Sequence, residues 1–316
     1  MTLIVFFIFG AVVLGAGAML SPAYPTSQPR IGLNASLALA LIAGGAVFYG
    51  TAAGWNTLVV DYMLFLLVTS IFLGGTLSFG QKRAEARGEE LADADQGWPG
   101  PYDLLGLGAA LTVFIVVALA QAGSGVAAAH LTFDAQAVNA GTESLYVTSA
   151  PAHTALTAYL SGQLSAPLGE VGWGLIAVLG GVFVWIAYDL GAELRDKSLG
   201  RVLAAIAFVP ALITVFATDG AILLGMTFTL AFVTYSVRYL RGSSRADLVV
   251  AGLMLGAVIL TVPAAVWVAL ACAIAATALI ARQNGPARAA LYALVTVIVA
   301  AAATAPTLIQ HGLPIL

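Results

Sequence analysis

The sequence predicts an all-α polytopic membrane protein with about ten transmembrane helices. Hydrophobic residues make up 61% of the 316 residues and charged residues only 9%, with a mean hydropathy of +0.99. Soluble domains typically contain about 25% charged residues, which this chain does not approach. Apolar runs of roughly 20 residues, the length that crosses a hydrocarbon core about 30 Å thick, recur along the sequence.

The ten predicted spans follow one another through mostly short connections. Two boundaries rest on few residues: Pro263 alone separates two apolar runs, and Thr218, Asp219 and Gly220 form a tight turn. The first run is similar to a signal peptide but lacks the basic residues that precede the apolar part of one, so it is predicted as a helix. The predicted spans are residues 3–21, 31–50, 57–79, 103–122, 172–191, 200–217, 219–240, 246–262, 264–282 and 288–306.

The positions of the cations predict the topology. The twelve Lys and Arg residues fall into groups that are separated each time by two predicted spans, so all of them map to one face. By the positive-inside rule this face is cytoplasmic, and both termini and residues 123–171 are extracytoplasmic. The predicted location is the inner membrane. The cations are Arg30, Lys82, Arg83, Arg87, Arg195, Lys197, Arg201, Arg238, Arg241, Arg245, Arg282 and Arg288.

The charge and the cysteine content exclude two classes of function. The net charge is −3 and no basic face is available to neutralise phosphates, which argues against a nucleic-acid partner. Cys272 is the only cysteine, so the chain cannot form an internal disulfide or a cysteine-based metal site. Cys272 is predicted to be a small packing residue within an apolar run.

A charged segment divides the sequence into two parts. Residues 81–102 contain most of the charge of the N-terminal half and the sequence Trp-Pro-Gly-Pro, so they are predicted as a cytoplasmic linker. A three-helix membrane extension, residues 1–80, precedes the linker, and a membrane core, residues 103–316, follows it. Abundant Gly and Ala at four-residue spacing predict close packing between helices.

The 123–171 segment is too polar and too interrupted to cross the bilayer. Residues 134–147 and 153–164 are each predicted to form a short amphipathic helix that lies on the outer surface. The apolar side of the second helix would consist of Leu156, Tyr159, Leu160 and Leu164.

This segment and the helices after it resemble a known family. Phe133-Asp134 before a polar helix, followed by a Pro-Ala-His-Thr-Ala-Leu stretch from Pro151, resembles the first extracytoplasmic loop of GT-C glycosyltransferases. The relatives in question are of the protein O-mannosyltransferase and aminoarabinose transferase type. Residues 187–242 resemble their order of helix, basic turn, helix, aspartate turn, helix and basic turn. The resemblance covers about residues 103–290.

The resemblance implies a transferase that passes a sugar from a polyprenyl-phosphate carrier to an acceptor on the outer face. Asp134 matches the family's acidic position, as a base or a metal ligand, although the family often has Asp-Glu where this chain has Asp134-Ala135. Glu143, His153 and Asp219 are the predicted substrate-binding residues. Asp134 and Asp219 are the candidates for holding a divalent metal, and a lipid-linked sugar is the implied donor.

Each candidate residue also has a structural interpretation. Asp134 and Asp219 precede helical runs, where an aspartate caps free backbone N–H groups. His153 stands at a predicted helix start, where a histidine is commonly a surface or capping residue. Asp61 lies inside a predicted span near its outer end, where an ionisable group marks either a partner or access to water.

The charge map opens a second function class. A polyprenyl phosphate must be met by Lys, Arg or a metal, yet no Lys or Arg is predicted on the outer face. The alternative is a non-catalytic structural or accessory subunit that keeps the GT-C-like fold and packs against partner subunits of a larger membrane complex. A transporter is less favoured, because the sequence lacks paired Gly/Pro-broken helices in matched halves.

Overall fold

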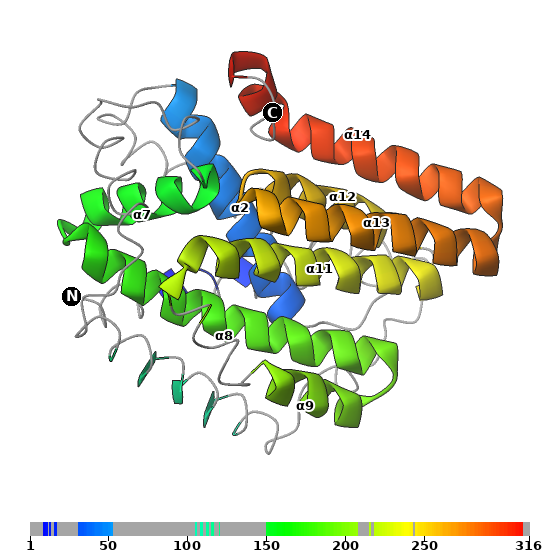
Figure 1. The fold of residues 1–316 in the computed structure, drawn as a ribbon, viewed down its shortest axis with the longest axis horizontal. Coiled ribbons are helices and arrows are strands. Elements are labelled where there is room, and N and C mark those ends of the chain that lie inside the picture. Colours follow the sequence, from blue (N-terminus) through cyan, green and yellow to red (C-terminus); the bar gives the residue numbers. More distant parts are fainter. Residues whose placement is uncertain are drawn as a thin grey trace, which may run out of the picture.

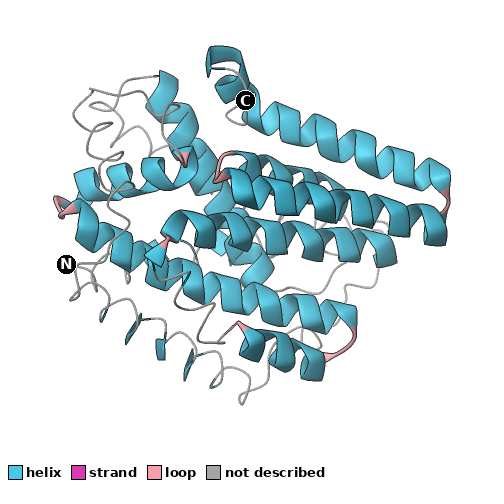
Figure 2. Ribbon diagram, in the orientation of Figure 1, coloured by secondary structure: helices cyan, strands magenta, loops and turns pink. Residues whose placement is uncertain are grey.

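The computed structural model describes residues 31–52, 150–207, 218–242 and 244–311, with isolated residues within 9–17 and 105–120 and Val215. Every regular element in these ranges is an α-helix (Figure 1; Figure 2). The helices are α2 (Ile31–Ala52), α7 (Pro151–Leu164), α8 (Leu168–Leu194), α9 (Lys197–Ile206), α11 (Gly220–Gly242), α12 (Arg245–Ile259), α13 (Pro263–Asn284) and α14 (Pro286–His311).

Four of the described helices are long and apolar enough to cross a membrane. They are α8, α11, α13 and residues Pro286–Ala305 of α14, while α2 contains a shorter apolar stretch, Gly32–Val47. An all-helical, membrane-embedded protein is therefore confirmed. Six predicted spans coincide with α2, α8, α11, α12, α13 and α14. The count of ten stays a prediction, because residues 57–79 and most of 3–21, 103–122 and 208–217 lie outside the described ranges. The described start of the predicted span 200–217 belongs to α9.

Proline and glycine set the boundaries between the last three helices. Val262 has an extended backbone (φ −77°, ψ 145°) and Pro263 opens α13, since the residue before a proline is driven out of the helical region. Gly285 has a φ of 93°, in the left-handed region that favours glycine, and Pro286 then starts α14. The single-proline boundary that the sequence predicts at Pro263 is confirmed.

Helices α8 and α11 form the centre of the bundle. They pack against each other, α8 also contacts α2 and α9, and α11 also contacts α12 and α13. Hydrogen bonds link α2 to both: the Leu33 amide donates to Oδ2 of Asp189 at 3.0 Å, and the Tyr235 hydroxyl donates to the Leu33 carbonyl at 3.2 Å. Helix α2 thus shares one core with the later helices, while the predicted 81–102 linker lies outside the described residues.

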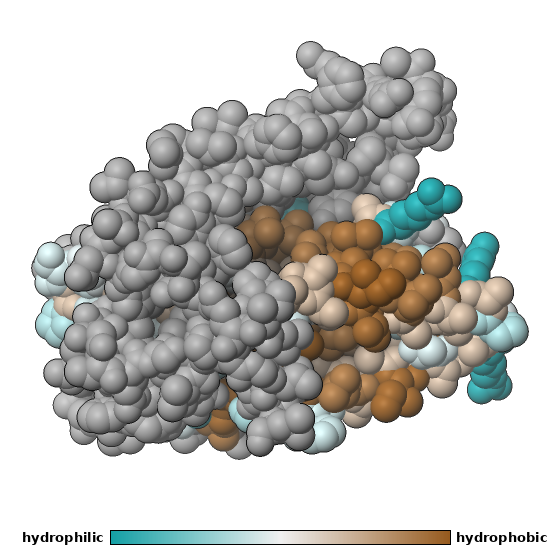
Figure 3. All heavy atoms as spheres, turned by 90° about the horizontal axis from the view of Figure 1, so that it is seen from above, coloured by the Kyte–Doolittle hydropathy of each residue, from teal (hydrophilic) through white to brown (hydrophobic). Residues whose placement is uncertain are grey.

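The cations gather at one end of the bundle. The described ranges contain eight of them, and these stand where α8, α11 and α13 end and where α9, α12 and α14 begin (Figure 1). In Figure 3 a broad apolar surface gives way to hydrophilic residues at this same end. We call it the basic end: Arg195, Lys197, Arg201, Arg238, Arg241, Arg245, Arg282 and Arg288. The side of the membrane on which it lies stays a prediction.

Glycines allow α12 and α14 to approach closely. A Cβ atom built on Gly256 would lie 2.9 Å from the Cβ of Ala303 and 3.2 Å from the Ala300 carbonyl oxygen, and one on Gly252 would lie 2.7 Å from the Cβ of Val299. Gly252 and Gly256 form a Gly-xxx-Gly pattern, which places both glycines on one face of α12. The predicted close packing of helices through small residues is confirmed between α12 and α14, at Gly252 and Gly256.

Helix α7 differs from its prediction as an amphipathic surface helix. All side chains from Pro151 to Leu160 are buried, polar ones included, because α2, α8 and α11 pack around the helix. Thr157 satisfies its hydroxyl within the helix by donating to the His153 carbonyl at 2.9 Å. The prediction that 153–164 is helical is confirmed, and the prediction that this helix lies on the surface with only one side buried is wrong.

Candidate functional site

The structure describes two of the four predicted site residues, and it brings them together. Asp134 and Glu143 lie outside the described residues, as does Asp61. His153 stands in the first turn of α7 and Asp219 directly precedes α11. Both lie against Gly220, at the end of the bundle opposite the basic end (Figure 1). We call this the acidic end, after Asp219 and Glu170, which stand at the starts of α11 and α8.

The His153 imidazole is packed rather than exposed. Its side chain is 3% exposed, and its Nδ1 lies 3.5 Å from the Thr157 hydroxyl. Its Nε2 faces Gly220 so closely that a Cβ atom there would lie 2.6 Å away. Glycine at position 220 therefore makes room for the ring, which joins the start of α7 to the start of α11.

Asp219 is the N-cap of α11. Its Oδ1 accepts hydrogen bonds from the Ala221 and Ile222 amides, each at 3.0 Å. The carboxylate thus satisfies two free N–H groups and interacts favourably with the positive end of the helix dipole. The capping interpretation is confirmed for Asp219. An ionised carboxylate has about four lone-pair sites, so capping leaves Asp219 able to accept further bonds.

The acidic end lacks an assembled metal site within the described ranges. There, no group of three or more His, Cys, Asp or Glu side chains is placed to hold a metal ion. All eight described cations lie at the basic end, so those residues offer no Lys or Arg to a phosphate at the acidic end. A metal on Asp134 and Asp219 stays a prediction, because Asp134 lies outside the described residues.

Tyr159 carries a neutral phenol farther along α7. It lies two turns after the start of α7 and is 7% exposed. Burial raises the pKa of Tyr159 to about 12, because removing water penalises the charged phenolate. The side chain therefore stays protonated at neutral pH and acts as a packing group with a polar tip.

An ionic cluster at the basic end was not predicted from the sequence. Nε of Arg238 lies 3.3 Å from Oδ1 of Asp247, and its Nη1 lies 3.3 Å from Oε1 of Glu193. The three side chains are 7%, 3% and 17% exposed. Arg241 adds hydrogen bonds to the carbonyl oxygens of Glu193 and Leu194. The cluster fastens α8, α11 and α12 to one another.

Two features of the sequence could have indicated buried polar contacts, one at Asp189 and one at Arg238. Asp189 lies inside a predicted span, where an ionisable residue is costly and usually has a partner, and here it binds the Leu33 amide at the start of α2. Arg238 is likewise the only cation within the predicted span 219–240. Its position inside an apolar run, rather than its sign, is the signal for a buried partner.

Comparisons with family models, curated proteins and solved structures find no match to this chain.

Proposed function

We propose that this chain is a membrane glycosyltransferase-like protein that transfers a sugar from a polyprenyl-phosphate carrier on the extracytoplasmic face. One observation supports the proposal above others. His153 of α7 and Asp219 before α11 are distant in sequence, yet both lie against Gly220 at the acidic end. The resemblance to GT-C enzymes predicts such proximity between the first outer loop and the aspartate turn.

The proposed chemistry gives Asp134 two roles and each of the other three residues one. An acceptor hydroxyl attacks the anomeric carbon of the donor, the bond to the polyprenyl phosphate breaks, and Asp134 takes the hydroxyl proton. Asp219 and Asp134 together would hold a divalent cation that meets the charge of the departing phosphate, since the described residues place no Lys or Arg there. Glu143 would bind the acceptor. His153 is a positioning residue, because its ring is buried against Gly220.

The test uses the purified full chain, undecaprenyl phosphate as the probe and thermal unfolding as the readout. Undecaprenyl phosphate should raise Tm in the presence of Mg²⁺ or Mn²⁺ and not in the presence of a chelator. Asp134→Asn and Asp219→Asn should each abolish the rise. Asn caps a helix about as well as Asp, so Asp219→Asn should leave the Tm of the protein without ligand nearly unchanged.

Two results would overturn the proposal. The first is a wild-type chain whose Tm does not respond to undecaprenyl phosphate with either metal. The second is a response that persists unchanged in both Asn variants, because the carboxylates would then have no part in binding. Glu170, in the first turn of α8, supplies the control: Glu170→Gln removes another carboxylate at the same end of the bundle and should keep the full response.

A second candidate function is a non-catalytic accessory subunit of a membrane complex. It is favoured because both described site residues have structural roles: Asp219 caps α11, and His153 fills the space beside Gly220. Purification from its native membrane in a mild detergent distinguishes the two candidates. An accessory subunit should co-migrate with other membrane proteins in fixed ratio and ignore undecaprenyl phosphate, whereas a self-sufficient enzyme should purify alone and respond.

A further inference from the structure

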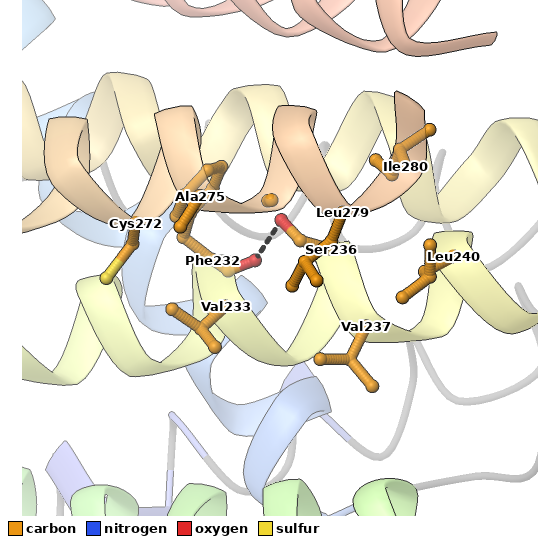
Figure 4. A pocket seen from close by; sticks show the side chains of 10 residues that line it. Phe232, Val233, Ser236, Val237, Leu240, Cys272, Ala275, Leu279 and Ile280 are labelled. Carbon is orange, nitrogen blue, oxygen red and sulfur yellow. Dashed lines mark hydrogen bonds between the residues drawn. The ribbon is translucent and has the colours of Figure 1, made fainter. Parts of the chain in front are cut away.

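An apolar crevice runs between α11 and α13. Its volume is about 170 Å³, and side chains of the two helices face each other across it (Figure 4). Cys272 stands at one end of the crevice, and Leu240 and Ile280 stand at the other. The lining residues are Phe232, Val233, Ser236, Val237, Leu240, Cys272, Ala275, Ala276, Leu279 and Ile280.

The walls of the crevice offer hydrocarbon rather than hydrogen bonds. Ser236 is the only hydroxyl-bearing residue of the lining, and its Oγ donates to the Phe232 carbonyl at 2.8 Å. The same oxygen lies 2.7 Å from the Tyr292 hydroxyl of α14. The Ser236 hydroxyl is thus engaged within the protein, so an occupant of the crevice must itself be apolar.

The length of the crevice matches one leaflet of a bilayer. From Phe232 to Leu240 and from Cys272 to Ile280 each helix advances by about 12 Å, at about 1.5 Å per residue. Half of a hydrocarbon core is about 15 Å thick. Since α11 and α13 both qualify as membrane-spanning, the crevice extends from the basic end toward the middle of the membrane. A single acyl chain of a lipid is apolar and extends from the headgroup to the middle of the bilayer, so it matches both the walls and the length of the crevice.

Cations stand where the crevice meets the basic end. Arg241 follows the lining residue Leu240 directly, and Arg282 comes two positions after Ile280; both side chains are exposed. Arg241 hydrogen-bonds with two of its nitrogens to the last carbonyls of α8, so its guanidinium is held toward α8 rather than toward α13. A phosphate beside the Arg282 guanidinium would form charge-assisted hydrogen bonds.

We propose that this crevice binds an anionic glycerophospholipid, with one acyl chain between α11 and α13 and the headgroup phosphate at Arg282. Apolar walls alone would accept a chain from any lipid, and Arg282 selects the anionic headgroup. By the positive-inside rule the lipid belongs to the cytoplasmic leaflet. The crevice does not include the acidic end, so this inference is independent of the proposed sugar transfer.

The first experiment compares two lipids that differ only in the headgroup. The full chain in a neutral detergent is titrated with dioleoyl phosphatidylglycerol or dioleoyl phosphatidylcholine, and Tm is measured. Phosphatidylglycerol should raise Tm by several degrees more than phosphatidylcholine. Arg282→Gln should remove most of this difference, because the chain site remains while the headgroup partner is lost.

Matched alanines test the crevice itself. Ala275 and Ala278 are both exposed residues of α13, but only Ala275 lines the crevice. Ala275→Leu should suppress the response to phosphatidylglycerol, and Ala278→Leu should keep it. Far-UV circular dichroism checks that each variant is folded.

The native cysteine gives a readout that needs no substitution. Cys272 is the only cysteine and lines the crevice, so a bound acyl chain should slow its alkylation by a maleimide several-fold. Phosphatidylglycerol should protect Cys272 at lower concentration than phosphatidylcholine does. Equal effects of the two lipids on Tm and on Cys272, or an unaltered lipid response in folded Ala275→Leu, would overturn the proposal. If Ala275→Leu does not fold, the Cys272 measurement on the wild-type chain decides alone.

Discussion

Helices α8 and α13 are both long and apolar, yet they occupy opposite environments. Of the residues in the apolar stretch of α8, 89% are buried inside the protein, whereas only 22% of those in the apolar stretch of α13 are buried. The same contrast separates α11, at 72%, from α14, at 28%. Hydropathy therefore indicates which segments enter the membrane, but it does not indicate which of them form the centre of the bundle.

Polar groups distinguish the central helices from the peripheral ones. Helix α8 carries Asp189 and Glu193, and α11 carries Arg238; all three bind other helices. Between its first residue and Arg282, α13 has no Asp, Glu, Lys, Arg or His. A buried ionisable group needs a partner on another helix, and a helix surrounded by helices can provide one more readily than a helix surrounded by lipid.

The largest expected effect compares arginines at the basic end of the two kinds of helix. Arg238→Ala would leave Asp247 buried without its cation and should lower the free energy of unfolding by about 3–5 kcal/mol. Arg282→Ala, at an exposed position of α13, should cost less than about 0.5 kcal/mol. Denaturant unfolding in detergent micelles measures both. Similar losses in the two variants would remove the distinction between central and peripheral helices.

A somewhat smaller effect is expected from truncating apolar side chains. Phe228 of α11 is fully buried, so Phe228→Ala should destabilise the protein by about 3–4 kcal/mol through lost contacts and the cavity left behind. Ile274 of α13 is 72% exposed, so Ile274→Ala should change stability by less than about 0.5 kcal/mol. The same unfolding assay applies. A large loss in Ile274→Ala would show that a partner covers this face of α13 in the protein as purified.

The smallest of the three effects sharpens the comparison within the periphery. Helix α14 is poorly buried as a whole but approaches α12 at Gly256, where a methyl group would meet Ala303 and the Ala300 carbonyl. Gly256→Ala should therefore cost about 1–3 kcal/mol. A methyl group on Gly44 of α2 would meet no side chain or neighbouring helix within 4 Å, so Gly44→Ala is the control and should be neutral or slightly stabilising. A neutral Gly256→Ala would show that the α12–α14 contact is loose.

The helices and their boundaries were largely predictable, because they depend on neighbouring residues in the chain. Pro263 and the Gly285-Pro286 pair end and begin helices through local backbone restrictions, whatever surrounds them. The gathering of cations at one end was predictable for a similar reason: it follows from the order of spans and the position of each charge.

The candidate site was only partly predictable. The capping role of Asp219 follows from its place before α11 and is one of the two interpretations that the sequence supports. The burial of His153 does not follow from the sequence, because it depends on a ring of α7 meeting the glycine that starts α11. Asp134 and Glu143 stay predictions, since they lie outside the described residues.

The sequence by itself determined that this protein is a helical membrane protein whose eight described cations share one end. Only the tertiary structure decided that α8 and α11 are central, that α7 is buried, and that Arg238 joins Glu193 and Asp247. The physical reason is the range of the interactions. Membrane insertion and helix termination depend on composition and on adjacent residues, whereas burial and ion pairing depend on which helices pack together, and an apolar run of residues looks the same whether lipid or protein surrounds it.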